Sequence, residues 1–330
     1  MKNRLYVLYV LSVLLLFLLA ACSDEKSTET KTEPVALKPY PAFNADSAYA
    51  FVQQQVDFGP RVPGTKGHAD TKAWMMATLT RYGWAVQSQD FQANTYDGLT
   101  WNLSNVIASI NPSASKRILL AAHWDTRRIA DKDTERTDQP IDGANDGASG
   151  VAVLMEIARI ISTQPLPEGV GIDLIFFDGE DDGEPEFSTS RDNSKIWWCH
   201  GSQYWSKNKH QTNYSAYYGI LVDLVGGKNA RFYREGYSRK YASGILSKVW
   251  GNAALLGHSG FFIQQDAPEI LDDHAFVNEW AGIPTIDIID FSPEQGFGAY
   301  HHTHRDAMEG IDARTLKAVG ETVLATIYQE

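Results

Sequence analysis

The distribution of apolar residues along the chain predicts strands that alternate with helices. Two apolar runs, at 116–126 and 171–181, are too short for surface helices and are typical of central strands covered on both faces. Residues 145–162 are apolar on nearly every side and predict a buried helix that begins with Asn145 and Asp146 as capping residues. Further strands are expected at 101–112, 216–227 and 283–291, and further helices at 67–83, 238–256 and 312–328. This alternation indicates an α/β fold with a mostly parallel, doubly wound sheet.

The N-terminus has the pattern of a secretory signal, with a basic start, an apolar run and then small residues. Its end at Cys22 resembles the bacterial lipobox, which predicts a signal peptide at 1–21 and lipidation of Cys22. A plain signal peptide or an uncleaved anchor is the alternative. Residues 22–41 are polar and contain prolines, as in a tether, and 42–330 are expected to form one domain. Lipidation would place the protein in a bacterial cell envelope, facing the periplasm or the cell surface.

The charge balance argues against nucleic acid or an anionic lipid surface as a partner. The 330 residues include 41 acidic and 29 basic side chains, and the formal net charge is −12. Cysteine occurs only at Cys22 and Cys199, so acylation of Cys22 would leave no internal disulfide. Cys199 lies among tryptophans in the sequence, which favours burial as a small apolar side chain over a nucleophilic role. A monomer is the expected oligomeric state.

Acidic residues and histidines follow the predicted strands at the points where the strands end. His123, Asp146, the pair Glu180 and Asp181, and Asp223 come from four successive segments, and two more clusters lie at 271–274 and 300–306. Because the carboxyl ends of parallel strands meet at one edge of a sheet, we expect these side chains to lie together. Oxygen and nitrogen ligands without thiolates suit a catalytic zinc ion with an open coordination position.

Each of these residues also has a simpler interpretation when it is considered alone. Asp146 could serve only as a helix cap, and His123 could be a hydrogen-bonded core residue. The acidic run at 178–184 could be a solvated loop or a calcium site. Their joint placement after successive apolar strands is what favours the metal site.

Several motifs together resemble one known superfamily. The segments HWD, DGANDGASGVAVLMEIAR, IFFDGED, LVDLVGG, DDHAF and HHTHRD occur in the order and spacing of the zinc-dependent aminopeptidases and glutaminyl cyclases related to peptidase family M28. The resemblance, which is to the bacterial members, extends from residue 59 to the C-terminal helix. It implies a three-layer α/β/α fold with a central, mostly parallel mixed sheet and a shallow zinc pocket at the strand ends.

The same resemblance implies a role for particular residues. Asp146, Asp181 and His302 match the zinc ligands, and Glu180 matches the general acid/base. Asp223 and Asp272 match two acids that share a hydrogen-bonded network with the catalytic glutamate. The family more often has Glu at the position of Asp181. Motif register favours Asp272 over Asp273 and favours His302 over the two neighbouring histidines, His301 and His304, but both choices stay open at this point.

Two reactions occur in this superfamily, and the residues exclude neither. An aminopeptidase holds two zinc ions, with Asp146 bridging them and with His123 and Asp223 as ligands of the second. A glutaminyl cyclase holds one and converts an N-terminal Gln into pyroglutamate with release of ammonia. The close match of the motifs favours the cyclase, which would act on the N-termini of peptides or proteins. A di-zinc aminopeptidase and a catalytically silent peptide-binding relative are the alternatives.

Aromatic residues near the predicted site could form the wall of a substrate pocket. An intramolecular attack requires a folded substrate, and stacked rings can impose that shape and exclude water. Core packing is the simpler explanation for any one of them. Two loops, at 182–198 and 291–302, are expected to act as lids or specificity elements. The candidate pocket residues are Trp197, Trp198, Phe297, Tyr300, His301 and Asp273.

Overall fold

The computed structural model describes residues 36–185, 187–188 and 194–330. The predicted signal peptide, Cys22 and most of the predicted tether lie outside the described residues. Leu37–Glu330 form one compact unit. Among the described residues, no helix combines the length and the apolar character needed to cross a membrane.

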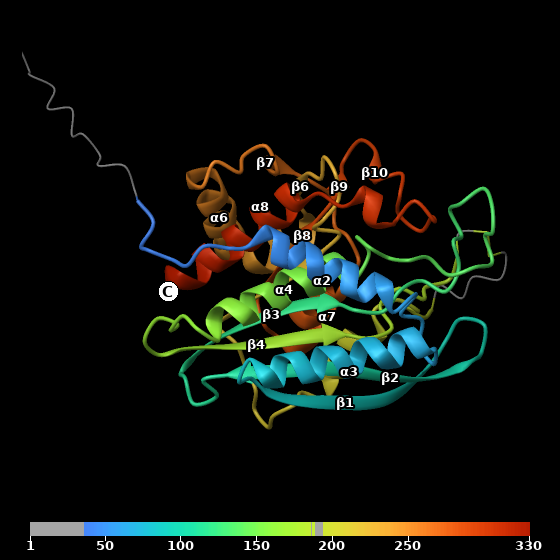
Figure 1. Ribbon diagram of the computed structural model, residues 1–330, viewed down its shortest axis with the longest axis horizontal. Helices are drawn as coiled ribbons and strands as arrows, with labels where there is room; N and C mark the ends of the chain where they lie inside the picture. Colours follow the sequence, from blue (N-terminus) through green and yellow to red (C-terminus); the bar gives the residue numbers. More distant parts are fainter. Residues whose placement is uncertain (1–35, 186, 189–193) are drawn as a thin grey trace, which may run out of the picture. The chain divides into compact units, whose positions relative to one another are not determined.

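A mixed sheet lies at the centre of this unit, and Figure 1 shows helices on both of its sides. Within the described part of the chain it has six strands in the order β1-β2-β4-β3-β5-β8. The four strands β4, β3, β5 and β8 run parallel, whereas β2 is antiparallel to both β1 and β4. The strands are β1 (Ala85–Asn94), β2 (Thr100–Ile110), β3 (Lys116–His123), β4 (Val170–Phe177), β5 (Tyr218–Asp223) and β8 (Thr285–Ile289). The predicted fold class is confirmed.

Helices cover both faces of the sheet, and a hydrophobic core lies beneath the helices on each face. Ile118, Leu120 and Ala122 of β3 belong to the larger core, whereas Leu119 and Ala121 point to the smaller one. The first face carries α2 (Ala45–Asp57), α3 (Lys66–Arg81), α4 (Ala148–Ile161), α6 (Gly236–Leu255) and α8 (Ala313–Tyr328). The second carries α5 (His200–Lys207), α7 (Asp273–Phe276) and a π-helical turn, Val277–Ala281.

Short elements complete the fold around the carboxyl edge of the sheet. Two small ribbons pair β6 (Phe232–Arg234) with β7 (Phe262–Asp266) and β9 (Phe291–Ser292) with β10 (Gly296–Phe297). A single 3-10 turn, Met308–Gly310, precedes α8. The β9–β10 ribbon lies within the loop predicted at 291–302, so part of that loop is a hairpin.

Helix α4 is buried as predicted, but its start differs from the prediction. Every residue of α4 except Arg159 is buried, in keeping with its apolar sequence. Its N-cap is Gly147, and no side chain caps it. The prediction that Asn145 and Asp146 cap this helix is therefore wrong. Gly147 has a φ of +89°, which favours glycine, and this turn leaves the Asp146 carboxylate free to point away from the helix.

Close packing of α4 on the sheet predicts a stability effect at Gly150. A Cβ atom added there would overlap the backbone oxygen of Val222 and would lie 3.0 Å from Cβ of Ala122. Gly150→Ala should therefore lower the free energy of unfolding by about 1–3 kcal/mol, because the helix must move off β3 and β5.

Gly251→Ala is the matched control, because Gly251 lies inside α6 and a Cβ atom added there would have nothing within 4 Å. It should raise the free energy of unfolding by roughly 0.5–1 kcal/mol through helix propensity. Urea unfolding of both variants gives the comparison. Equal midpoints for the two would contradict the close packing of α4.

Candidate functional site

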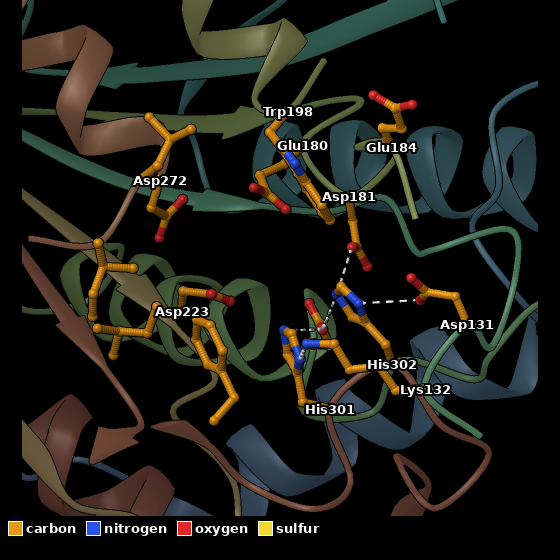
Figure 2. A pocket seen from close by; sticks show the side chains of 15 residues that line it. Asp131, Lys132, Glu180, Asp181, Glu184, Trp198, Asp223, Asp272, His301 and His302 are labelled. Atoms are coloured by element: carbon orange, nitrogen blue, oxygen red, sulfur yellow. Dashed lines mark hydrogen bonds and ion pairs between the residues drawn. The ribbon is translucent and has the colours of Figure 1, made fainter. Parts of the chain in front are cut away.

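A pocket opens at the carboxyl edge of the parallel strands, and Figure 2 shows the side chains around it. Five separate segments contribute to it: the β3–α4 loop, the chain after β4, the end of β5, the residues before α7, and the end of β8 with the loop that follows. The lining residues are Asp131, Lys132, Asp146, Glu180, Asp181, Glu184, Trp198, Asp223, Ile270, Leu271, Asp272, Ile289, Phe297, His301 and His302. The fold thus brings the predicted catalytic and metal-binding residues to one place.

Asp146, Asp181 and His302 form a cluster suited to a metal ion. Nε2 of His302 lies 3.1 Å from Oδ1 of Asp181 and 3.9 Å from Oδ2 of Asp146. Both carboxylate oxygens of Asp181, and Oδ2 of Asp146, are buried without a hydrogen-bond donor among the described residues. Buried carboxylates are paired or coordinate a metal, so these orphaned oxygens call for a cation. Two carboxylates and one imidazole are a ligand set that zinc accepts.

Two further acidic residues fix the backbone that carries these ligands. The carboxylate of Asp125 accepts the N–H groups of Glu180 and Asp181, both at 3.1 Å. The carboxylate of Asp306 accepts the N–H group of Asn145 at 2.7 Å and that of Asp146 at 2.9 Å. Each loop is therefore held by a carboxylate that receives two backbone donors.

The three neighbouring histidines lie in different surroundings. Nδ1 of His302 is 3.3 Å from Oδ1 of Asp131, and this contact directs Nε2 into the pocket, as Figure 2 shows. His301 stacks between Phe297 and His302, with ring centroids 4.2 and 3.7 Å away. His304 turns away from the pocket to Asp133, 3.0 Å from Nδ1. Nε2 of His301 lies 4.0 Å from Oδ2 of Asp146, so His301 and His302 could both share a metal ion with that carboxylate, and His302 also contacts Asp181.

A second cluster adjoins the first through Asp146. Nε2 of His123 lies 3.1 Å from Oδ1 of Asp146 and 3.0 Å from Oδ1 of Asp223. These ligand atoms are close enough to hold a second metal ion. They also satisfy one another by direct hydrogen bonding, so the cluster is compatible with one ion or with two.

Glu180 faces the ligand cluster from the chain after β4. Burial raises the pKa of this carboxyl group well above its ordinary value, and the negative charges of Asp272 and Asp181 act in the same direction. Burial, together with Asp223, raises the pKa of Asp272 to about 6. The Sγ atom of Cys199 lies 3.3 Å from Oε1 of Glu180, so the thiol donates to this carboxyl group. Such a group can carry a proton between two reacting atoms.

Of the two adjacent acids before and in α7, Asp272 is the one that lines the pocket. Asp273 is fully buried beside it, and neither oxygen of its carboxyl group has a hydrogen-bond partner among the described residues. The two adjacent tryptophans also differ in position. Trp198 lines the pocket, whereas Trp197 is outside the lining and lies under Lys195, whose Nζ is 5.1 Å from its ring centroid.

Tyr300 lies outside the pocket as well. Its hydroxyl group donates to Oδ2 of Asp290 at 2.8 Å, and its ring borders a separate polar hollow beside β9 and β10. Phe297, by contrast, lines the pocket with the apolar side chains of Ile289 and Leu271. In the loop predicted at 182–198, residues 186 and 189–193 lie outside the described part of the chain.

Sequence reasoning missed the residues that support the ligands. Asp125 ends the motif HWD and Asp306 ends the motif HHTHRD, so these motifs could have indicated both residues. Asp131 and Lys132 lie in a loop between β3 and α4 that has no periodic pattern. Nothing in the local sequence distinguishes them from other charged loop residues.

The comparisons with known proteins agree with this geometry. The model of peptidase family M28 matches residues 105–327. The solved structure of Bacteroides thetaiotaomicron glutaminyl cyclase bound to N-acetylhistamine is 49% identical and has a TM-score of 0.86, covering 88% of this chain and 100% of that one. A Zn-dependent exopeptidase from Parabacteroides distasonis is 48% identical with a TM-score of 0.85 and the same coverage of both chains.

A curated relative, the glutaminyl-peptide cyclotransferase-like protein of Bos taurus, is 28% identical over 193 residues, which are 52% of this chain and 46% of the relative. The chain therefore spans about half the length of this relative. The family model, in contrast, covers most of the present chain, and the solved structures match it over nearly all of the described fold. The resemblance predicted from the motifs is confirmed, and the chain belongs to peptidase family M28.

Proposed function

We propose that this protein is a zinc-dependent glutaminyl-peptide cyclotransferase, which converts an N-terminal Gln into pyroglutamate and releases ammonia. The observation that carries the proposal is the position of Glu180, a carboxyl group with a raised pKa that faces the ligand cluster in a pocket with apolar and aromatic walls. Similarity to solved glutaminyl cyclases over most of the chain supports it. The substrates would be the N-termini of peptides or proteins.

Asp146, Asp181 and His302 would hold one zinc ion, because their orphaned oxygens and the imidazole Nε2 converge. When bound there, zinc supplies Lewis acidity toward the γ-carboxamide oxygen of the substrate glutamine. Asp131 would keep His302 in the tautomer with Nε2 free for the metal, through the contact at Nδ1.

Glu180 would move the proton that the reaction transfers. The α-amine nitrogen of the substrate forms a bond to Cδ of its own side chain, and the bond from Cδ to the amide nitrogen breaks. Glu180 accepts a proton from the attacking amine and gives it to the departing nitrogen, which leaves as ammonia. Asp272 and Asp223, which also line the pocket, would hold the network around this carboxyl group.

The pocket walls would fold the substrate for this attack. Trp198 stacks at 5.8 Å from the ring of His302, and Phe297 stacks on His301. Rings on two sides of a small pocket confine the glutamine side chain and exclude water, which favours the intramolecular amine over hydrolysis.

A di-zinc aminopeptidase is the second candidate. The cluster of His123, Asp146 and Asp223 favours it, since these three could hold a second ion that activates water. Similarity to a Zn-dependent exopeptidase also supports this alternative.

Mass spectrometry of peptide products separates the two activities. Purified protein incubated with a Gln-led peptide should release ammonia and leave a product about 17 Da lighter by the loss of NH3, with the first residue retained. An Ala-led peptide should stay intact. Release of free alanine would favour the aminopeptidase, and no turnover of either peptide would favour a catalytically silent binding relative.

Variants of the pocket separate metal binding from proton transfer. Glu180→Gln should keep the metal and lower kcat by about 100-fold or more, because the amide cannot carry the proton. Asp146→Ala should lose the metal. We expect one zinc per wild-type chain, measured by elemental analysis, whereas two would favour the aminopeptidase.

Glu156→Gln is the matched control for Glu180→Gln. Glu156 is a buried carboxylate of α4 that pairs with Arg159 at 2.7 Å, away from the pocket. This variant should keep both metal and activity. Full activity in Glu180→Gln would refute the proposal that Glu180 transfers the proton.

We also propose that Cys22 is lipidated and anchors the protein to a bacterial membrane, since the N-terminal sequence has the lipobox pattern. Metabolic labelling of bacteria with a radioactive or clickable fatty acid should label the wild-type protein. Cys22→Ser should abolish the label and release the protein from the membrane fraction. Labelling that persists in Cys22→Ser would contradict the assignment.

A further inference from the structure

The edge of the sheet at which β3, β4, β5 and β8 begin, which we call the amino edge, lies opposite the pocket and contains the start of the domain. The backbone N–H of Lys38 donates to Oε1 of Gln329 at 2.7 Å, and its Nζ donates to the backbone oxygen of the same residue at 3.0 Å. Glu330, the next residue, accepts the hydroxyl group of Tyr218, the first residue of β5, at 2.9 Å. In Figure 1 the blue start of the domain and the C-terminus accordingly lie on the side away from the arrowheads of β3 and β4. The chain that follows the predicted tether therefore joins the domain at the amino edge.

Two aromatic side chains are exposed at the amino edge. Tyr217 directly precedes β5 and is 62% exposed, and Trp280, in the π-helical turn that leads into β8, is 40% exposed. A lysine lies over each ring: Nζ of Lys116 is 4.7 Å from the ring centroid of Tyr217, and Nζ of Lys207 is 3.9 Å from that of Trp280. Exposed tryptophan, tyrosine and lysine side chains are the types that lie at the boundary between a bilayer and water.

The two edges of the sheet differ in charge. Lys38, Lys116 and Lys207 lie at the amino edge with two exposed acids, Glu168 and Glu279. At the opposite, carboxyl edge, seven acidic side chains line the pocket. Lysines attract the phosphates of lipid headgroups, whereas carboxylates are repelled by them, so the amino edge is the more suitable of the two for contact with a bilayer. The formal net charge of −12 still disfavours a strongly anionic surface, so the lipid that fits is mainly zwitterionic.

The predicted tether does not fix the orientation of the domain by itself. Residues 22–36 would reach at most about 50 Å at full extension. Strand β3 has 8 residues and spans about 26 Å from the amino edge to the carboxyl edge. Either edge could therefore touch a bilayer that holds Cys22, and the side chains exposed at each edge decide between them.

We propose that the amino edge, with Tyr217, Trp280 and their lysines, contacts the surface of a lipid bilayer and that the pocket faces away from the membrane. This inference rests on the proposed lipidation of Cys22, which would bring the domain to the membrane. The pocket then opens to the aqueous side, where the N-termini of soluble peptides and proteins can enter it. N-termini that lie in the headgroup region of the same membrane are out of its reach.

Fluorescence quenching in vesicles tests this orientation. The full lipidated chain is bound to phosphatidylcholine vesicles that contain a lipid with a nitroxide on its headgroup, and one engineered cysteine carries a fluorophore. Ser215→Cys places the fluorophore in the exposed loop before β5, at the amino edge, and Leu99→Cys places it in the turn between β1 and β2, at the carboxyl edge, where Leu99 is 48% exposed. Cys199 is fully buried and Cys22 would be acylated, so neither should react with the dye. Quenching should be at least about threefold stronger at position 215 than at position 99, because roughly 26 Å of sheet separates the two edges.

A second set of variants tests the contact itself. In the chain with the fluorophore at position 215, Tyr217→Ser together with Trp280→Ser should lower the quenching at least about twofold, because the rings no longer hold this edge at the headgroups. Phe187→Ser is the matched control, since Phe187 is an aromatic side chain that is 65% exposed in the loop after β4, at the carboxyl edge. Its loss should leave the quenching unchanged. All three are surface side chains, so the variants should fold, which circular dichroism checks.

Four results would overturn the inference. Equal quenching at positions 215 and 99 would show that the domain has no preferred orientation, and stronger quenching at position 99 would show that the pocket faces the bilayer. No quenching at either position would show that the domain stays away from the bilayer. Unchanged quenching after the loss of Tyr217 and Trp280 would show that these rings do not make the contact.

Vesicle binding is measured first, by sedimentation, and it separates this inference from the proposals made above. A chain that carries no fatty acid at Cys22 and stays in the supernatant would refute the lipid anchor and, with it, this orientation. None of these measurements requires turnover, so a protein that leaves Gln-led peptides intact would refute the catalytic proposal alone.

Discussion

Carboxylates that lose their hydration must gain an opposing charge, a donor or a proton, and this requirement governs the whole carboxyl edge of the sheet. Seven acidic side chains line one pocket, and five of them are predicted site residues: Asp146, Glu180, Asp181, Asp223 and Asp272. Two of them, with His302, leave orphaned oxygens for a cation, and the others depend on His123 or on shared protons. The proposed reaction uses two of these groups: the cation held by Asp146, Asp181 and His302, and the proton carried by Glu180.

The loops that carry the ligands are themselves held by acids. The carboxylates of Asp125 and Asp306 are each stabilised by hydrogen bonds from two backbone N–H groups. Arg61 is fully buried and donates to the backbone oxygen of Gly143 at 2.6 Å, so it also holds the loop that carries Asp146. Ligand positions therefore depend on hydrogen bonds to the main chain, which limit how far each carboxylate can move.

Backbone conformations near the pocket are also unusual for their residue types. His302, Leu224 and Cys199 have φ values of +58°, +53° and +61°, a region that favours glycine. Each adjoins the site: His302 is a proposed ligand, Leu224 follows Asp223, and Cys199 contacts Glu180. Such conformations cost about 1–3 kcal/mol each and persist only where the surroundings enforce them. Here the surroundings are the packed strand ends and the hydrogen bonds of the pocket.

The amino-acid pattern by itself determined the alternating strands and the buried helix α4, because elements covered on all sides are apolar throughout. It also indicated that acidic residues gather at one edge, because they follow the ends of successive strands. The amino-acid pattern did not show which of several adjacent loop residues points into the pocket. In the acidic run 178–184, only the tertiary structure pairs Asp178 with His68 and Asp182 with Arg128. The other three acids of the run, Glu180, Asp181 and Glu184, line the pocket. The orientation of His302 likewise depends on a left-handed turn and a contact with Asp131, a residue far away in the sequence. Loop residues have no periodic constraint, so contacts between distant segments decide which side chain points inward.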